Sequence, residues 1–174
     1  MPESTIDREF LRVSSTQLQQ HSSAIDKCLA QLSEDQVWAR GGDNENAIGN
    51  LVLHLCGNVR QWIIGGVGGA PDVRKRDTEF AARGGLSTRE LRDRLAATVA
   101  EATQIIEAVT AARMLDPLLI QGYDVSGLEA IYHVVEHFSG HTGQIIFATK
   151  MLTGSDLGFY RHLSSAAPQG PTTP

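Results

Sequence analysis

The residues with the clearest chemical potential are three histidines spaced four apart, His133, His137 and His141. Imidazole is the commonest metal ligand in proteins, and this spacing places the three rings on roughly one side of a helix. An α-helix rises about 1.5 Å per residue, so neighbouring rings are about 6 Å apart and can share an ion, whereas the outer pair is about 12 Å apart and cannot. The helix therefore offers two ligands, either His133 with His137 or His137 with His141.

A third ligand must come from elsewhere, and His54 is the strongest candidate. It lies in an apolar stretch with Leu51, Val52 and Leu55, where a lone histidine is more often a hydrogen-bonded core residue. A buried histidine pair that needs a partner on a neighbouring helix favours the ligand interpretation. His21 is the rival, but its polar neighbours predict a solvent-facing position.

One alternative metal motif overlaps the histidine row. The stretch from His133 to His137 matches the H-x-x-E-H of inverted zinc peptidases, in which Glu136 would be the general base. The pattern is short, and those larger enzymes need a further, distant acidic ligand. Di-iron bundles use Glu-x-x-His pairs, and none occurs here, so a ferritin-like centre is not expected.

Four helices must position these side chains. Apolar residues recur at near-helical spacing in four stretches, 4–32, 44–63, 87–113 and 126–152. Asn44 or Asn46 could cap the second helix. Ser87 and Glu90 form a capping-box signature at the start of the third, and Gly154 is a C-terminal stop for the fourth.

The predicted fold is all-α, a four-helix bundle with long loops between helices two and three and between helices three and four. Residues 71–85 form the first loop, in which balanced charges at positions 72–79 predict a solvated segment. Residues 118–124 form the second, whose short apolar run could be extended chain packed on the bundle. Strand signals are weak throughout.

Length and composition place this bundle in one domain. A chain of 174 residues fits a single domain, expected at 1–163, and the composition of residues 164–174 predicts a disordered tail. The net charge of −5 gives no reason to expect nucleic acid binding. No apolar run approaches the roughly 20 residues that cross a membrane, and the polar, acidic start is unlike a signal peptide, so we expect a cytoplasmic protein. Cys28 and Cys56 are expected to be buried thiols.

Two helical stretches resemble a known family. N-A-I-G-N-L-V-L-H-L-C-G-N-V-R-Q-W-I at 46–63 and H-V-V-E-H-F-S-G-H-T-G-Q-I at 133–145 resemble the DinB/YfiT-like superfamily of metal-dependent enzymes. The resemblance covers about residues 10–152. Within the superfamily, the 46–63 stretch and R-D-T-E-F at 76–80 most resemble a branch of uncharacterised bacterial proteins. The resemblance implies a bundle of unusual connectivity, often a homodimer. It also implies a metal triad of His54, His137 and His141, which selects the second histidine pair over the first.

The resemblance also implies a chemistry. Characterised relatives include transferases and isomerases that use a low-molecular-weight thiol such as bacillithiol, mycothiol or glutathione, and their metal is usually zinc or nickel. Three neutral imidazoles leave the ion its full charge and at least one open position. Such an ion can activate a thiol or lower the pKa of bound water. A thiol-dependent S-transferase acting on a small-molecule substrate, a hydrolase and a non-catalytic metal-binding or interaction protein therefore all stay open.

Further residues could orient the ligands or touch the substrate, because they lie about one turn from a candidate ligand. These residues are Asn50, Asn58, His133 and Gln144. Gly140 and Gly143 lie inside the fourth helix despite a propensity cost of about 1 kcal/mol each. They predict a close helix approach or a dimer seam.

Overall fold

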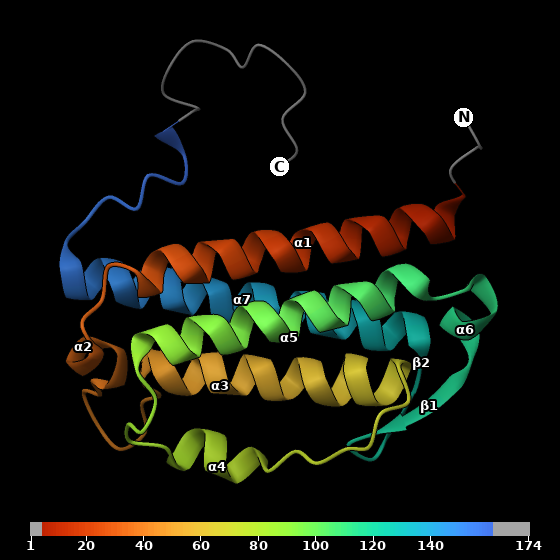
Figure 1. Ribbon diagram of the computed structural model, residues 1–174, viewed down its shortest axis with the longest axis horizontal. Coiled ribbons are helices and arrows are strands. Elements are labelled where there is room, and N and C mark those ends of the chain that lie inside the picture. Colours follow the sequence, from red (N-terminus) through yellow and green to blue (C-terminus); the bar gives the residue numbers. More distant parts are fainter. Residues whose placement is uncertain (1–4, 162–174) are drawn as a thin grey trace.

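The computed structural model describes residues 5–161, so the predicted tail at 164–174 lies outside the described residues. Four long helices form the bundle: α1 (Ile6–Leu29), α3 (Ile48–Val59), α5 (Thr88–Ala108) and α7 (Gly127–Thr153). Figure 1 shows that α1 and α7 run in one direction and α3 and α5 in the other. Helices α1 and α3 each pack against both α5 and α7. The all-α prediction is confirmed.

Because α3 and α5 are parallel, the chain between them must return along the whole bundle. It leaves α3 through a π-helix, η1 (Arg60–Val67), in which backbone N–H groups bond to carbonyl oxygens five residues earlier. The hydrogen bond from Gly68 N to Ile63 O, at 2.8 Å, follows this pattern. It then passes beneath α3 through the short helix α4 (Arg76–Ala81), as Figure 1 shows. The predicted loop at 71–85 is thus partly helical, and it packs on α3.

Capping residues fix where the helices begin. Ser87 accepts from Glu90 N at 3.3 Å, and Glu90 accepts from Ser87 N at 2.8 Å, which is the capping box expected at α5. The predicted cap of α3 by Asn44 or Asn46 is wrong. The helix begins after Ala47, whose N–H donates to the side-chain oxygen of Asn50 at 3.1 Å.

The segment between α5 and α7 departs from the sequence prediction in two ways. The third long helix ends at Ala108, because Val109 is extended and Thr110 caps a separate helix, α6 (Ala111–Leu115). The apolar run that follows is indeed extended. It pairs as β1 (Pro117–Ile120) with β2 (Tyr123–Ser126) in an antiparallel hairpin, whose turn residues Gln121 and Gly122 both have positive φ.

Apolar side chains from all four long helices fill the core, with Phe138, Leu18 and Ile25 among those completely buried. Cys28 and Cys56 are free and buried, as predicted. Among the described residues, no helix combines the length and apolarity needed to cross a membrane.

Gly140 and Gly143 are not explained by packing within the chain. A β-carbon built at either position would meet no atom of the described chain within 4 Å. The predicted close approach between helices of one chain is therefore wrong at both positions, and a dimer seam stays a prediction.

Gly143→Ala should raise the free energy of unfolding by about 1 kcal/mol, or Tm by roughly 2–4 °C, because alanine fits the open space and restricts the unfolded chain. Thermal unfolding measures this. Gly49→Ala is the matched control, because its β-carbon would lie 2.8 Å from the Trp38 ring, and it should destabilise. Destabilisation by Gly143→Ala would contradict an open face.

Candidate metal centre

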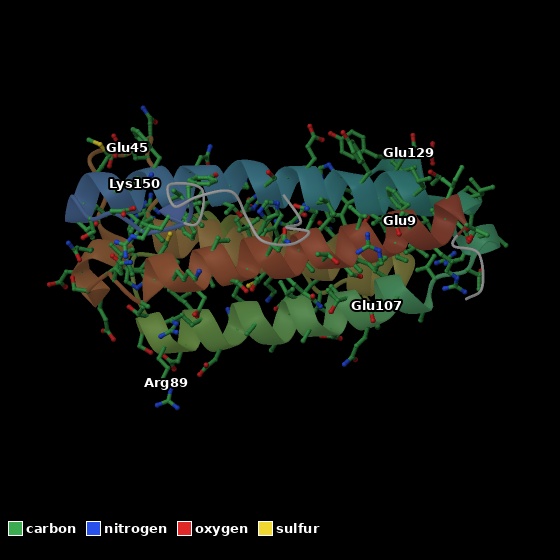
Figure 2. All side chains as sticks on the ribbon, turned by 90° about the horizontal axis from the view of Figure 1, so that it is seen from above. Glu9, Glu45, Arg89, Glu107, Glu129 and Lys150 are labelled. Carbon is green, nitrogen blue, oxygen red and sulfur yellow. The ribbon has the colours of Figure 1, made fainter. Side chains whose placement is uncertain are left out.

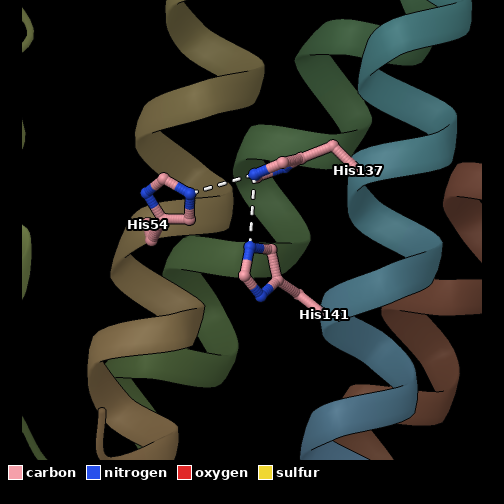
Figure 3. Close-up of side chains that lie close together, drawn as sticks. All are labelled: His54, His137 and His141. Carbon is pink, nitrogen blue, oxygen red and sulfur yellow. Dashed lines mark hydrogen bonds between the residues drawn. The ribbon is translucent and has the colours of Figure 1, made fainter. Parts of the chain in front are cut away.

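Three histidine side chains from two antiparallel helices point toward one another, His54 from α3 and His137 and His141 from α7 (Figure 3). The Nε2 atom of His137 lies 3.0 Å from His54 Nε2 and 3.2 Å from His141 Nε2. One nitrogen from each ring lies within 4.8 Å of the others. Tetrahedral zinc with bonds of about 2.0–2.1 Å holds its ligand nitrogens about 3.3 Å apart. The cluster could therefore hold a metal ion.

Hydrogen bonds on the far side of two rings aim their lone pairs at the cluster. His54 Nδ1 lies 3.1 Å from both Glu79 Oε2, which can only accept, and Arg74 Nη2, which can only donate. Because Arg74 Nη2 already donates to Glu79 Oε2 at 2.8 Å, a proton on Nδ1 satisfies the carboxylate, and that tautomer leaves Nε2 bare. His141 Nδ1 donates to Gln144 Oε1 at 2.7 Å, with the same consequence. His137 Nδ1 is buried and has no partner among residues 5–161. His137 Nε2 lies within hydrogen-bond distance of both other Nε2 atoms, so a proton on it would be shared with a neighbouring ring, and a bound ion would take the place of that proton.

The pKa values of the two rings on α7 favour their neutral forms. Burial, followed by the proximity of His141 and His54, lowers the pKa of His137 to about 3. Burial also lowers the pKa of His141, although the hydrogen bond to Gln144 opposes the change. Neutral imidazole is the form that binds metal. His137 and His141 are therefore in the metal-binding form at neutral pH.

Glu79 is the functional residue that sequence reasoning missed. Arg74 donates to both of its carboxylate oxygens at 2.8 Å, and the Arg74 and Glu79 side chains are only 4% and 10% exposed. Burial opposes ionisation of Glu79, but the hydrogen bonds from Arg74 and His54 outweigh it and lower its pKa. The prediction of a solvated loop is thus wrong for these two residues. The signal for Glu79 was the R-D-T-E-F motif at 76–80 in the family resemblance, whereas Arg74 lies outside that motif.

Two residues of α3 make room for Glu79 and fasten its segment. A β-carbon at Gly57 would overlap the Glu79 carboxylate and lie 2.9 Å from Arg74 Nε, so any larger residue there would displace this ion pair. Asn50 is buried and donates to the carbonyl oxygens of Glu79 at 2.8 Å and Ala82 at 3.0 Å. Asn50 therefore positions the backbone that carries Glu79 and does not contact the His54 ring directly.

His133 and Asn58 lie beside the cluster. His133 packs on Trp62, with ring centroids 4.1 Å apart, and its Nε2 is 3.5 Å from Asn58 Nδ2. His133 is not one of the three residues whose ring nitrogens converge. The structure therefore brings together His137 with His141 and does not assemble the H-x-x-E-H alternative. His21 lies apart, stacked on Phe138.

A groove of about 390 Å³ runs along α7 beside the cluster, and we call it the histidine groove. It is lined by His133, Glu136, His137, Gly140, His141 and Gln144. Two of the three clustered rings thus face a space that a small molecule can enter. Besides them, the groove offers His133, Glu136 and Gln144 as polar groups.

The fold resembles that of two solved proteins. A conserved protein from Enterococcus faecalis has a TM-score of 0.71 at 15% identity, over 83% of this chain and 97% of that one. A DinB-like protein from Bacillus subtilis has a TM-score of 0.65 at 14% identity, over 84% of this chain and 96% of that one. At these identities the likeness shows the fold alone, and the fold is DinB-like.

The chain belongs to the family described as protein of unknown function DUF1572, which matches residues 5–167. No curated protein matches the chain.

Glu79→Gln should weaken binding of zinc 10–100-fold, because the residue that orients a ligand histidine typically contributes that much to metal affinity. Competition with a chromophoric chelator measures the affinity. Glu101→Gln is the control, since it removes a carboxylate from an exposed pair with Arg60. Equal affinity of Glu79→Gln and the native protein would contradict the role of Glu79.

The lowered pKa of His137 predicts how the metal-free protein responds to acid. In the unfolded chain this group titrates near 6.5, so between that pH and about 3 the unfolded state binds more protons than the folded state. The free energy of unfolding should therefore fall as pH falls through this window. Urea unfolding of chelator-treated protein at pH 7 and pH 5 measures the loss, which should be smaller in His137→Gln. An unchanged loss in that variant would contradict the assignment.

Proposed function

We propose that this chain is a divalent-metal-dependent enzyme whose ion, zinc or nickel, is held by His54, His137 and His141. The observation that carries the proposal is the convergence of three imidazole nitrogens, with the Nε2 atom of His137 3.0 Å from that of His54 and 3.2 Å from that of His141. Glu79 and Gln144 support it, because each has an oxygen placed to accept the Nδ1 proton of a ligand ring, on the side away from the ion. A structural ion would favour a fourth protein ligand, and no fourth His, Cys, Asp or Glu joins the cluster among the described residues.

We further propose that the reaction is an S-transfer that uses a low-molecular-weight thiol. When bound, the ion supplies charge that lowers the pKa of a thiol or of water. The protein's own part is to admit the substrate through the histidine groove and to accept a proton there. Glu136 and His133 line that groove and are not clustered ligands, so either is placed to take the proton.

A metal-dependent hydrolase is the second candidate, and the same groove favours it equally if water replaces the thiol.

The homodimer and the cytoplasmic location stay predictions. Support for the dimer comes from apolar side chains exposed on α7, where Tyr132, Phe147 and Met151 are 59–71% exposed. A second copy could cover this face.

Metal analysis of the native protein and its histidine variants tests the site. His54→Ala and His141→Ala should lose the ion, because two imidazoles bind it far more weakly than three. His133→Ala and His21→Ala, the matched controls, should retain it. Retention by His141→Ala together with loss by His133→Ala would contradict the triad and favour the peptidase-like alternative.

A substrate screen tests the reaction separately. Each cellular thiol is supplied with an electrophilic acceptor, and parallel reactions contain esters and amides without thiol. The proposal expects thiol consumption that stops with a chelator and returns with zinc or nickel. Ester or amide cleavage with no thiol consumption would favour the hydrolase, and metal binding without either activity would favour a non-catalytic role.

A further inference from the structure

A second cavity, which we call the α3–α5 cavity, lies between α3 with η1, the returning segment and α5. Its volume is about 630 Å³, within the range of small-molecule sites. Arg74 and Glu79 line it, and none of the three clustered histidines does. It also shares no lining residue with the histidine groove. The chain therefore has two separate spaces in which a small molecule could bind.

The charges around the α3–α5 cavity leave a positive surplus. Four cations line it, Arg60, Arg74, Lys75 and Arg94, against three carboxylates, Asp72, Glu79 and Glu101. All three carboxylates are already engaged. Glu79 accepts from Arg74 at 2.8 Å, Glu101 pairs with Arg60 at 3.3 Å, and Asp72 accepts from Gln61 at 2.7 Å.

Two of the cations are free to bind a ligand. Within residues 5–161, the side chains of Lys75 and Arg94 take part in no ion pair shorter than 4.0 Å. Both are exposed, one on the returning segment and the other on α5. They therefore present charge from two walls of the same cavity.

The remaining walls are largely apolar. Leu53, Ile64 and Val73 contribute aliphatic side chains, and Cys56 contributes a buried thiol. Burial raises the pKa of the Cys56 thiol to about 11, so it stays protonated and acts as an apolar surface. A ligand that fits these walls needs an apolar body, and its charged end must be anionic.

We propose that the α3–α5 cavity binds a small carboxylate with an apolar body, its carboxylate held by Lys75 and Arg94 and its body packed on Leu53, Ile64 and Val73. The inference does not depend on the metal, because the residues that would hold the ligand are outside the histidine cluster. It assigns a ligand to a space that the proposed reaction does not use.

Isothermal titration of the full-length native protein with octanoate tests this proposal, with octanol and octylamine as neutral and cationic counterparts. Octanoate should bind at least tenfold more tightly than either, since bonds to charged groups contribute about 1.5–3 kcal/mol each. The titration is repeated after metal removal, and binding should persist. Binding that disappears with the metal would show coordination to the ion and overturn the proposal.

Variants locate the binding. Lys75→Gln combined with Arg94→Gln should weaken octanoate binding about tenfold or more. Val73→Trp, at an exposed rim position, should block it by filling space. Arg89→Gln is the matched control, because Arg89 also lies on α5 but is 90% exposed and projects away from the bundle (Figure 2). Unchanged binding in both test variants, or octanol binding as tightly as octanoate, would overturn the proposal.

Discussion

The position of one proton, on Nδ1 of His54, determines what the histidine cluster can do. With the proton on Nδ1, His54 donates to Glu79 Oε2 at 3.1 Å, and Nε2 is left bare toward the rings of α7. Arg74 Nη2 is also 3.1 Å from Nδ1, but it donates to the same carboxylate oxygen at 2.8 Å. If the proton moved to Nε2, it would occupy the space where an ion binds. Glu79 can only hold it while remaining ionised in a nearly buried position, and it remains ionised because Arg74 bonds both carboxylate oxygens.

The unusual order of the helices serves this arrangement. Since α3 and α5 are parallel, the chain must return beneath α3, and the returning segment brings Arg74 and Glu79 against the outer side of His54. Asn50 fastens the segment through two backbone carbonyls, and Gly57 leaves room for the carboxylate. Helix α7 supplies the other two rings from the inner side. The connection between helices is thus part of the site.

Sequence reasoning recovered the features that depend on local spacing. The four long helices, the capping box at Ser87 and the limit of two ligands per helix all follow from helical periodicity. The choice of His141 over His133 needed the family resemblance, because both pairs have the same spacing. Glu79 was missed because its burial depends on contacts between segments that are distant in the sequence. The β-hairpin is local, and it was missed because each of its strands is only four residues long. A run of balanced charges predicts a solvent-exposed segment. Here the fold packs the segment against α3, which buries Glu79.

X-ray absorption spectroscopy of the native protein at the edge of its bound metal tests the central claim most directly. Three imidazoles should give a nitrogen shell at about 2.0–2.1 Å for zinc, with the scattering pattern of histidine rings and no sulfur. The His141→Ala variant should lose that signal. A sulfur shell at about 2.3 Å, or a shell of oxygen alone, would contradict the three-histidine site.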